Sequence, residues 1–240
     1  MSPVIFNLSK IRYGYPGGPL VLNDLDFHLH AGDRIGLVAP NGSGKTTLFH
    51  IIMGLIKPLS GTVEAFGEVR ETEADFVEVR RRIGLLFQDA DDQLFSPTVL
   101  EDVAFGPLNL GKSRDEAVAV ARKTLDFLGL NGFEDRVTYK LSGGEKRLVS
   151  LATVLAMEPE VLLLDEPSTG LDSSTKDKLI DILNGLALSF VLISHEFDFL
   201  SKTAGHIYTM DGGRIRFDQE LHIHTHEHAH LMGRQPHRHV

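Results

Sequence analysis

The sequence predicts an α/β fold with a mainly parallel β-sheet, an antiparallel β flank and an inserted helical subdomain. Short runs rich in Val, Ile and Leu alternate with helical patterns along most of the chain, which is typical of β-α-β connections. These runs are apolar on both faces, as expected for parallel strands that helices cover on each side of a sheet. The opening stretch and the middle of the chain depart from this alternation, and they predict the flank and the insertion.

The predicted elements follow this pattern in chain order. Residues 4–8 and 21–30, on either side of a turn-rich stretch at 13–19, are expected to form antiparallel strands beside the main sheet. The main strands are predicted at 34–38, 83–87, 161–164, 190–194 and 207–210, and the crossover helices at 45–55, 175–186 and 196–203.

Residues from about 88 to 157 are predicted to form the helical subdomain. Ser113 and Glu116 have the spacing of a capping box, and apolar residues follow at 118, 121, 125 and 128. After residue 217 the composition becomes polar and rich in histidine, without a sustained apolar face. We therefore expect one domain over residues 1–217 and a histidine-rich tail over 218–240.

Composition excludes several classes of protein. A chain of 240 residues with 42% hydrophobic and 24% charged residues is expected to bury one folded core. No apolar run approaches the roughly 20 residues of a membrane-spanning helix, and the first residues lack a secretory pattern. The absence of cysteine fits a reducing cytoplasm, and the net charge of −9 argues against a nucleic-acid partner.

A glycine-rich segment, APNGSGKTT at residues 39–47, lies between a predicted strand and a predicted helix. In that context backbone N–H groups surround phosphates, and the helix N-terminus adds electrostatic attraction. Lys45 is expected to reach the outer phosphates and the Thr46 hydroxyl to ligate Mg²⁺. The alternative is a glycine-rich turn with a solvated lysine. The predicted nucleotide-binding residues are Asn41, Gly42, Ser43, Gly44, Lys45, Thr46 and Thr47.

Two adjacent acids, Asp165 and Glu166, end a buried strand-like run. Asp165 is placed to hold Mg²⁺ and Glu166 to polarise an attacking water, because phosphoryl transfer needs mostly positioning and charge compensation. The alternative is that both acids only cap the turn before Pro167. His195 follows another predicted strand, at the carboxyl edge where open α/β sheets bind ligands.

Residues 1 to about 217 resemble the ATPase subunits of ABC transporters, which have a P-loop nucleoside triphosphatase (NTPase) core. The phosphate loop is followed, in the family's order, by Gln88, the segment LSGGE at 141–145, the acid pair, the segment STGLD at 168–172 and His195. LSGGE resembles the ABC signature, and the ordered set is far more specific than any one member. The resemblance implies an ATP- and Mg²⁺-dependent motor that works as a homodimer or with a paired ATPase subunit. It also implies a peripheral place at the cytoplasmic face of the membrane, bound to integral membrane transporter subunits.

The resemblance implies roles for single residues as well. ATP is sandwiched between two subunits, so that Ser142, Gly143 and Gly144 of one chain meet the γ-phosphate held by Lys45 of the other. The remaining implied roles are adenine stacking for Tyr15, sensing of Mg²⁺ and the transporter for Gln88, the catalytic base for Glu166, a link between the two sites for Asp172, and a γ-phosphate contact for His195.

Two positions depart from the family's pattern. Ala39 stands where the phosphate loop usually begins with glycine, and its methyl group is tolerated only if φ is negative there. Glu145 stands where the signature usually has glutamine, which changes the charge near the partner's nucleotide. Neither change removes a group that the chemistry needs, so hydrolysis is expected. If both together abolish turnover, the chain is instead a metal-binding or regulatory protein with an inactive nucleotide site.

The cargo is indicated by two features. The segments FQDADDQLFSPTV at 87–99 and EDVAFGP at 101–107 resemble ATPase subunits of energy-coupling-factor importers, including the cobalt and nickel branch. Seven of the 12 histidines lie in the tail, and imidazole suits nickel, cobalt, zinc and copper. These are His222, His224, His226, His228, His230, His237 and His239.

We therefore predict import of cobalt or nickel ions and transition-metal binding by the tail. A solvated tail or a purification remnant is the alternative for residues 218–240. For the whole chain, the alternatives are an energy-coupling-factor ATPase for a vitamin or other small solute, and a non-transport ABC ATPase acting on DNA or ribosomes. The acidic charge and the absence of sustained heptads argue against the latter.

Overall fold

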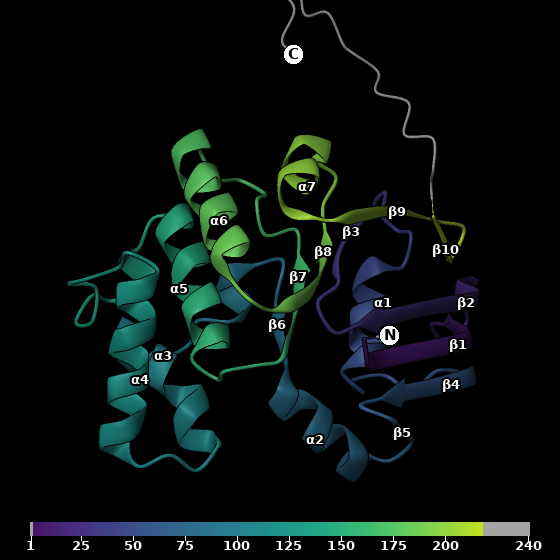
Figure 1. Cartoon of the computed structure of the whole chain (residues 1–240), viewed down its shortest axis with the longest axis horizontal. Helices are drawn as coiled ribbons and strands as arrows, with labels where there is room; N and C mark the ends of the chain where they lie inside the picture. Colours follow the sequence, from purple (N-terminus) through teal and green to yellow (C-terminus); the bar gives the residue numbers. More distant parts are fainter. Residues whose placement is uncertain (1, 218–240) are drawn as a thin grey trace, which may run out of the picture.

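The computed structural model describes residues 2–217 and contains two β-sheets with helices around them (Figure 1). The histidine-rich tail at 218–240, which was predicted to bind transition metals, lies outside the described residues. In the described part, no helix is long and apolar enough to cross a membrane.

The larger sheet has six strands in the order β10-β9-β3-β8-β7-β6. The five strands from β9 to β6 are mutually parallel, and only β10 at the edge runs antiparallel to its neighbour β9. The strands are β3 (Arg34–Val38), β6 (Ile83–Leu86), β7 (Val161–Asp165), β8 (Ser189–Ile193), β9 (His206–Asp211) and β10 (Arg214–Phe217).

Both faces of this sheet are buried, as the unbroken apolar runs predicted. In β7, Val161 and Leu163 join a core cluster with α1 (Lys45–Ile52) and the antiparallel flank, whereas Leu162 and Leu164 join a second cluster on the other face. That second face is covered by α5 (Gly143–Leu155), α6 (Ser173–Gly185) and α7 (Phe197–Thr203). Alternating side chains of one strand therefore pack into two separate hydrophobic cores, one on each face of the sheet.

The flank is a four-stranded antiparallel sheet in the order β2-β1-β4-β5. Its strands are β1 (Val4–Gly14), β2 (Leu20–His30), β4 (Ser60–Ala65) and β5 (Glu68–Val69). In Figure 1 this sheet lies at the opposite end of the molecule from α3 (Val99–Asn109) and α4 (Arg114–Phe127). The remaining elements are α2 (Glu73–Arg82), η1 (Ala90–Asp92) and η2 (Thr138–Lys140).

Capping boxes fix the start of four helices. In α2, α3, α4 and α5 the N-cap hydroxyl accepts from the N3 backbone N–H while the N3 carboxylate accepts from the N-cap N–H. The box at Ser113 and Glu116 was predicted from spacing and starts α4. The box at Ser142 and Glu145 starts α5 within the signature segment.

The structure confirms the α/β class and differs in detail from the predicted elements. Helix α1 ends at Ile52 rather than at 55, because Gly54 has φ +67° and its N–H bonds to Ile51 O at 3.0 Å. The Leu55 N–H bonds to His50 O at 2.8 Å, which completes a Schellman motif. Strands β4 and β5 and helix α2 were not predicted, and β1 continues to Gly14 into the stretch expected to be a turn.

Candidate active site

The predicted site residues follow the carboxyl ends of four parallel strands. The phosphate loop follows β3, Gln88 follows β6, Asp165 is the last residue of β7, and His195 follows β8. Because the strands are parallel, these ends lie at one edge of the sheet, where open α/β sheets bind ligands.

The phosphate loop depends on two left-handed glycines. Gly42 and Gly44 have φ +80° and +98°, and a Cβ on Gly44 would lie 2.8 Å from a Val21 methyl carbon and 2.9 Å from Leu22 Cδ2. Helix α1 then begins without a side-chain cap and without an acidic residue in its first turn, so its N-terminus favours an anion. Ala39 does not adopt positive φ, as the sequence required of its methyl group.

A buried ion pair joins the phosphate loop to the acid pair. Lys45 Nζ donates to Glu166 Oε1 at 2.9 Å and to Asn41 Oδ1 at 3.2 Å. The Lys45 and Glu166 side chains are only 8% and 2% exposed. The second Glu166 oxygen lies 2.9 Å from His195 Nδ1 and accepts from Thr169 Oγ1 at 3.3 Å. The structure thus brings the predicted base, the predicted phosphate lysine and the predicted histidine together.

The backbone at Glu166 is unusual for a residue with a side chain. Its φ is +48°, in the left-handed region, and its N–H bonds to Ile193 O at 2.9 Å. Such conformations cost on the order of 1–3 kcal/mol and cluster at functional sites. The carboxylate that sequence reasoning chose as the catalytic base is therefore held at a strained turn beyond β7.

Thr46 and Asp165 form a second polar pair. The Thr46 hydroxyl donates to Asp165 Oδ2 at 2.9 Å, while Asp165 Oδ1 and the nearby loop's Ser43 Oγ are buried without a hydrogen-bond partner among the described residues. Burial raises the pKa of Asp165, against the lowering effects of Thr46 and Lys45. An aspartate oxygen without a partner beside a threonine hydroxyl fits Mg²⁺, which prefers oxygen ligands.

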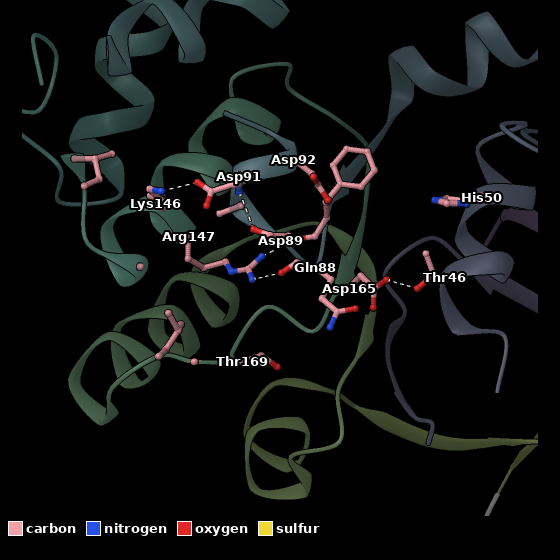
Figure 2. A pocket seen from close by; sticks show the side chains of 16 residues that line it. Thr46, His50, Gln88, Asp89, Asp91, Asp92, Lys146, Arg147, Asp165 and Thr169 are labelled. Atoms are coloured by element: carbon pink, nitrogen blue, oxygen red, sulfur yellow. Dashed lines mark hydrogen bonds and ion pairs between the residues drawn. The ribbon is translucent and has the colours of Figure 1, made fainter. Parts of the chain in front are cut away.

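Gln88, Asp165 and Thr46 also line one cavity, of about 850 Å³, together with Gly143 of the signature. Figure 2 shows the side chains of Gln88 and Asp165 close together, with Thr46 hydrogen-bonded to Asp165. The cavity extends from the phosphate loop across the Gln88 segment to the start of α5. The three residues predicted to act on the metal ion therefore share one space.

The predicted adenine contact, Tyr15, lies beside the first turn of α1. The Tyr15 hydroxyl is 3.2 Å from Thr47 Oγ1, and Tyr15 is 49% exposed. Tyr13 stands edge-on to it, with ring centroids 5.2 Å apart, and packs against the core. Of the two tyrosines, Tyr15 is thus the more exposed one, and it lies beside the loop.

The signature residues are placed at the N-terminus of α5. Ser142 is the N-cap, and its hydroxyl accepts from the Glu145 N–H at 3.3 Å. Gly143 lies in open space and Gly144 packs near Thr175. Asp172, predicted to link two sites, is the N-cap of α6, and Ser174 and Thr175 donate to its carboxylate and lower its pKa.

Glu145, which replaces the usual glutamine, does not present a free charge. Its carboxylate accepts from the Ser142 N–H and from Arg136 Nη1, each at 2.8 Å. The Ser142 backbone bond is the largest cause that holds the pKa of Glu145 below its usual value, and Arg136 acts in the same direction. The Arg136 guanidinium in turn lies 3.7 Å from the centre of the Phe133 ring.

Sequence reasoning missed three residues of this region: Thr169, Arg136 and Arg147. Arg147 on α5 is 5% exposed and donates to the main-chain carbonyls of Phe87 and Gln88. A signal was present, because Arg147 falls three, four and seven residues before the buried Ser150, Leu151 and Val154, on the helix's buried face. The contacts of Thr169 and Arg136 depend on loop geometry that carries no such pattern.

Comparisons with known proteins agree with this geometry. The family model described as ABC transporter matches residues 22–169, more than half of the 240-residue chain. The energy-coupling factor transporter ATP-binding protein EcfA of Methanothermobacter thermautotrophicus is 40% identical over 215 residues, which cover 88% of this chain and 69% of that relative.

Solved structures show the same fold. CbiO1 of Clostridium perfringens, part of the ABC transporter complex CbiONQ, superposes with a TM-score of 0.80 at 31% identity, over 89% of this chain and 87% of that one. The ATP-binding cassette MJ0796, in a dimeric post-hydrolysis state bound to ADP and phosphate, gives 0.80 at 26% identity, over 88% and 96%.

A glycine-rich loop, a buried contact of Lys45 with Glu166 and the helix that begins in the LSGGE segment occur in one chain, and the family model covers residues 22–169 of it. Members of this family bind ATP with Mg²⁺ and hydrolyse it. The chain therefore belongs to the ABC transporter family, as an ATP-hydrolysing subunit.

Proposed function

We propose that this subunit powers import through an energy-coupling-factor-type transporter, with cobalt or nickel ions as the cargo. The observation that carries the motor assignment is the buried contact of Lys45 with Glu166 at the carboxyl edge of the sheet. The similarity to EcfA and to CbiO1, a part of CbiONQ, supports the transporter class.

The chain's own residues divide the work at the phosphate. The backbone N–H groups of the loop and Lys45 bind the phosphates, since glycines keep the loop open and α1 has a free N-terminus. Thr46 and Asp165 hold Mg²⁺, with Gln88 facing the same cavity. Mg²⁺ held by these residues would supply positive charge against the charge that develops on the transferred phosphoryl group.

Glu166 serves as the catalytic base: it orients the attacking water and accepts a proton from it. It is buried, and Lys45, His195 and Thr169 hold its two oxygens. His195 is 63% exposed at its side chain, so its ring reaches the space outside the sheet edge while Nδ1 stays on Glu166. This arrangement favours a γ-phosphate contact for His195, and Tyr15 offers its exposed ring to adenine.

Two copies, or this chain and a related ATPase subunit, complete the site. Gly143 lies in an open position in the first turn of α5, next to the N-cap Ser142, and backbone N–H groups at a helix N-terminus suit a phosphate presented by a second chain. The dimeric state of MJ0796 supports pairing of this kind. The pair lies at the cytoplasmic face of the membrane, bound to integral membrane subunits.

The metal cargo rests on sequence features: the likeness of residues 87–107 to the cobalt and nickel branch, and seven histidines in the tail. A vitamin or another small solute is the second candidate cargo. The similarity to EcfA supports an energy-coupling-factor transporter in general and does not select a metal ion.

The test is uptake of radiolabelled Ni²⁺ or Co²⁺ by cells that carry the chain with its membrane partners. Wild type is compared with Glu166→Gln, and with Glu71→Gln, an exposed glutamate outside the site, as the matched control. Uptake lost only in Glu166→Gln supports an ATP-driven metal importer. Equal uptake in all three contradicts the role of Glu166, and no metal uptake in any of them rejects the metal cargo and favours a vitamin or another small solute.

A further inference from the structure

The segment that carries Gln88 is held by a buried arginine of the signature helix. Arg147 Nη1 donates to Phe87 O at 2.7 Å, and its other terminal nitrogen donates to Gln88 O. Figure 2 shows the guanidinium beside Gln88 and Asp89, on the side of the cavity away from Thr46. One side chain thus joins α5, whose N-cap is Ser142, to the end of the strand that Gln88 follows.

Arg147 is costly to keep in this position. It is 5% exposed, and burial lowers its pKa, against the opposing effect of Asp89 and Asp165. Its hydrogen bonds within residues 2–217 go to main-chain carbonyls rather than to a carboxylate. A charge buried without a hydrogen-bonded counterion is poor evidence for a purely stabilising role, because an apolar residue of similar size avoids the desolvation cost.

The geometry of the contact also requires a guanidinium. Two successive carbonyls are bound by two nitrogens of one planar fork, whereas a lysine ammonium is a point charge that cannot reproduce the fork. One carbonyl belongs to Gln88, whose side chain lines the cavity, and the other belongs to Phe87 just before it. The guanidinium therefore fixes the backbone on both sides of the Gln88 Cα.

A neighbouring side chain strengthens the same contact. Gln93 Nε2 donates to Ser150 O at 3.0 Å and to Thr153 Oγ1 at 2.9 Å, and its Oε1 accepts from the Phe87 N–H at 3.3 Å. Both ends of the segment from Phe87 to Gln93 are therefore hydrogen-bonded to α5, Phe87 to Arg147 and Gln93 to Ser150 and Thr153.

We propose that Arg147 is a positioning residue for Gln88: its two donated hydrogen bonds hold the backbone of residues 87 and 88, and so hold the Gln88 side chain in the cavity that it shares with Thr46 and Asp165. Without the guanidinium, the carbonyls of Phe87 and Gln88 lose both donors, and the Gln88 side chain is held less firmly in that cavity. The inference rests on the proposed function, because Gln88 has a role only if the cavity takes Mg²⁺ and ATP.

The test compares Arg147→Lys and Arg147→Met with Arg122→Met, which removes an exposed arginine of α4. We expect both Arg147 variants to lower kcat of the assembled transporter by about tenfold to a hundredfold, the range that small misplacement of a catalytic group produces. The KM for ATP should change by less than about threefold, since Lys45 and the phosphate loop are untouched. Arg122→Met should match wild type.

A double-variant cycle separates positioning from a merely structural effect. If Arg147 acts through Gln88, Arg147→Met adds no further loss of kcat to Gln88→Ala; multiplied losses overturn the proposal. Should Arg147→Met fail to fold, Arg147→Lys keeps the charge, and hydrogen exchange of residues 87–93 should then increase; unchanged exchange overturns the proposal.

Failure of the proposed function looks different from failure of this inference. Wild-type kcat in both Arg147 variants, while Glu166→Gln is inactive, rejects the role of Arg147 alone. Wild-type activity in Glu166→Gln rejects the function on which the inference rests.

Discussion

The buried pair of Lys45 and Glu166 gives the most direct test of the site. Lys45→Met keeps roughly the length of the side chain and removes its charge. The Glu166 carboxylate, whose side chain is only 2% exposed, then loses the ammonium that lies 2.9 Å from its Oε1. Removing one partner of a buried ion pair costs about 3–5 kcal/mol, because the other charge stays desolvated. In a domain of this size each 1 kcal/mol shifts Tm by about 2–4 °C, so Tm should fall by roughly 6–20 °C.

Lys202→Met is the matched control. Lys202 Nζ lies 2.8 Å from Asp198 Oδ2, nearly the same distance, but the two side chains are 49% and 79% exposed. Solvent screens such a pair, so its loss should cost less than about 1 kcal/mol. The two variants therefore each remove an ion pair of nearly equal length, one buried and one exposed to solvent.

Thermal unfolding followed by circular dichroism, without nucleotide, measures both variants. The double variant Lys45→Met with Glu166→Gln should lose less than the sum of its single variants, since the buried Glu166 charge that lacked its partner is then removed as well. A Tm loss in Lys45→Met no larger than that in Lys202→Met would refute the reasoning, and so would strictly additive losses.

Three further predictions concern single side chains. Tyr15→Ala should raise the KM for ATP about tenfold through lost stacking, while Tyr15→Phe keeps most of the affinity; ATPase kinetics decide, and equal effects would contradict a stacking role. Arg136→Gln should raise the KM for ATP by exposing the charge of Glu145, and adding Glu145→Gln should restore it in the same assay, whereas no restoration would reject compensation. Burial raises the pKa of Asp102 in the folded protein above that of an ordinary aspartate. The folded state is therefore the harder one to ionise, and the free energy of unfolding falls as the pH rises from the ordinary pKa through the raised one. Asp102→Asn should therefore raise Tm at neutral pH, with an advantage over wild type that shrinks on acidification; a constant difference would contradict this sign.

The main sheet was predictable because its signal is local. Each parallel strand is an unbroken apolar run, and the runs are buried on both faces as in β7. Helix α2 was missed for the opposite reason: only Phe76 and Val79 are buried among its ten residues, so it has almost no apolar stripe. Its capping box at Thr72 and Asp75 was the one signal that the sequence offered.

Single site residues were predictable where a motif fixes the spacing, as in the phosphate loop and the acid pair. Their contacts were not. The bond of His195 to Glu166 spans 29 positions, and that of Arg147 to Phe87 spans 60. The left-handed backbone of Glu166 was equally hidden, because glutamate gives no preference for positive φ.

The sheet and the helices position different parts of the site. Lys45, His195 and Glu166 follow β3, β8 and β7, which are consecutive neighbours in the sheet, so short loops bring the three groups within 2.9 Å contacts. Gln88 follows β6 at the sheet edge, and its backbone is fixed by Arg147 of α5 rather than by another strand end. The groups that we propose to bind the phosphate and to activate water are therefore positioned by the sheet. Gln88 depends on a side chain of α5 for its backbone position, so substitution of Arg147 should disturb the proposed metal side of the site more than the contact between Lys45 and Glu166.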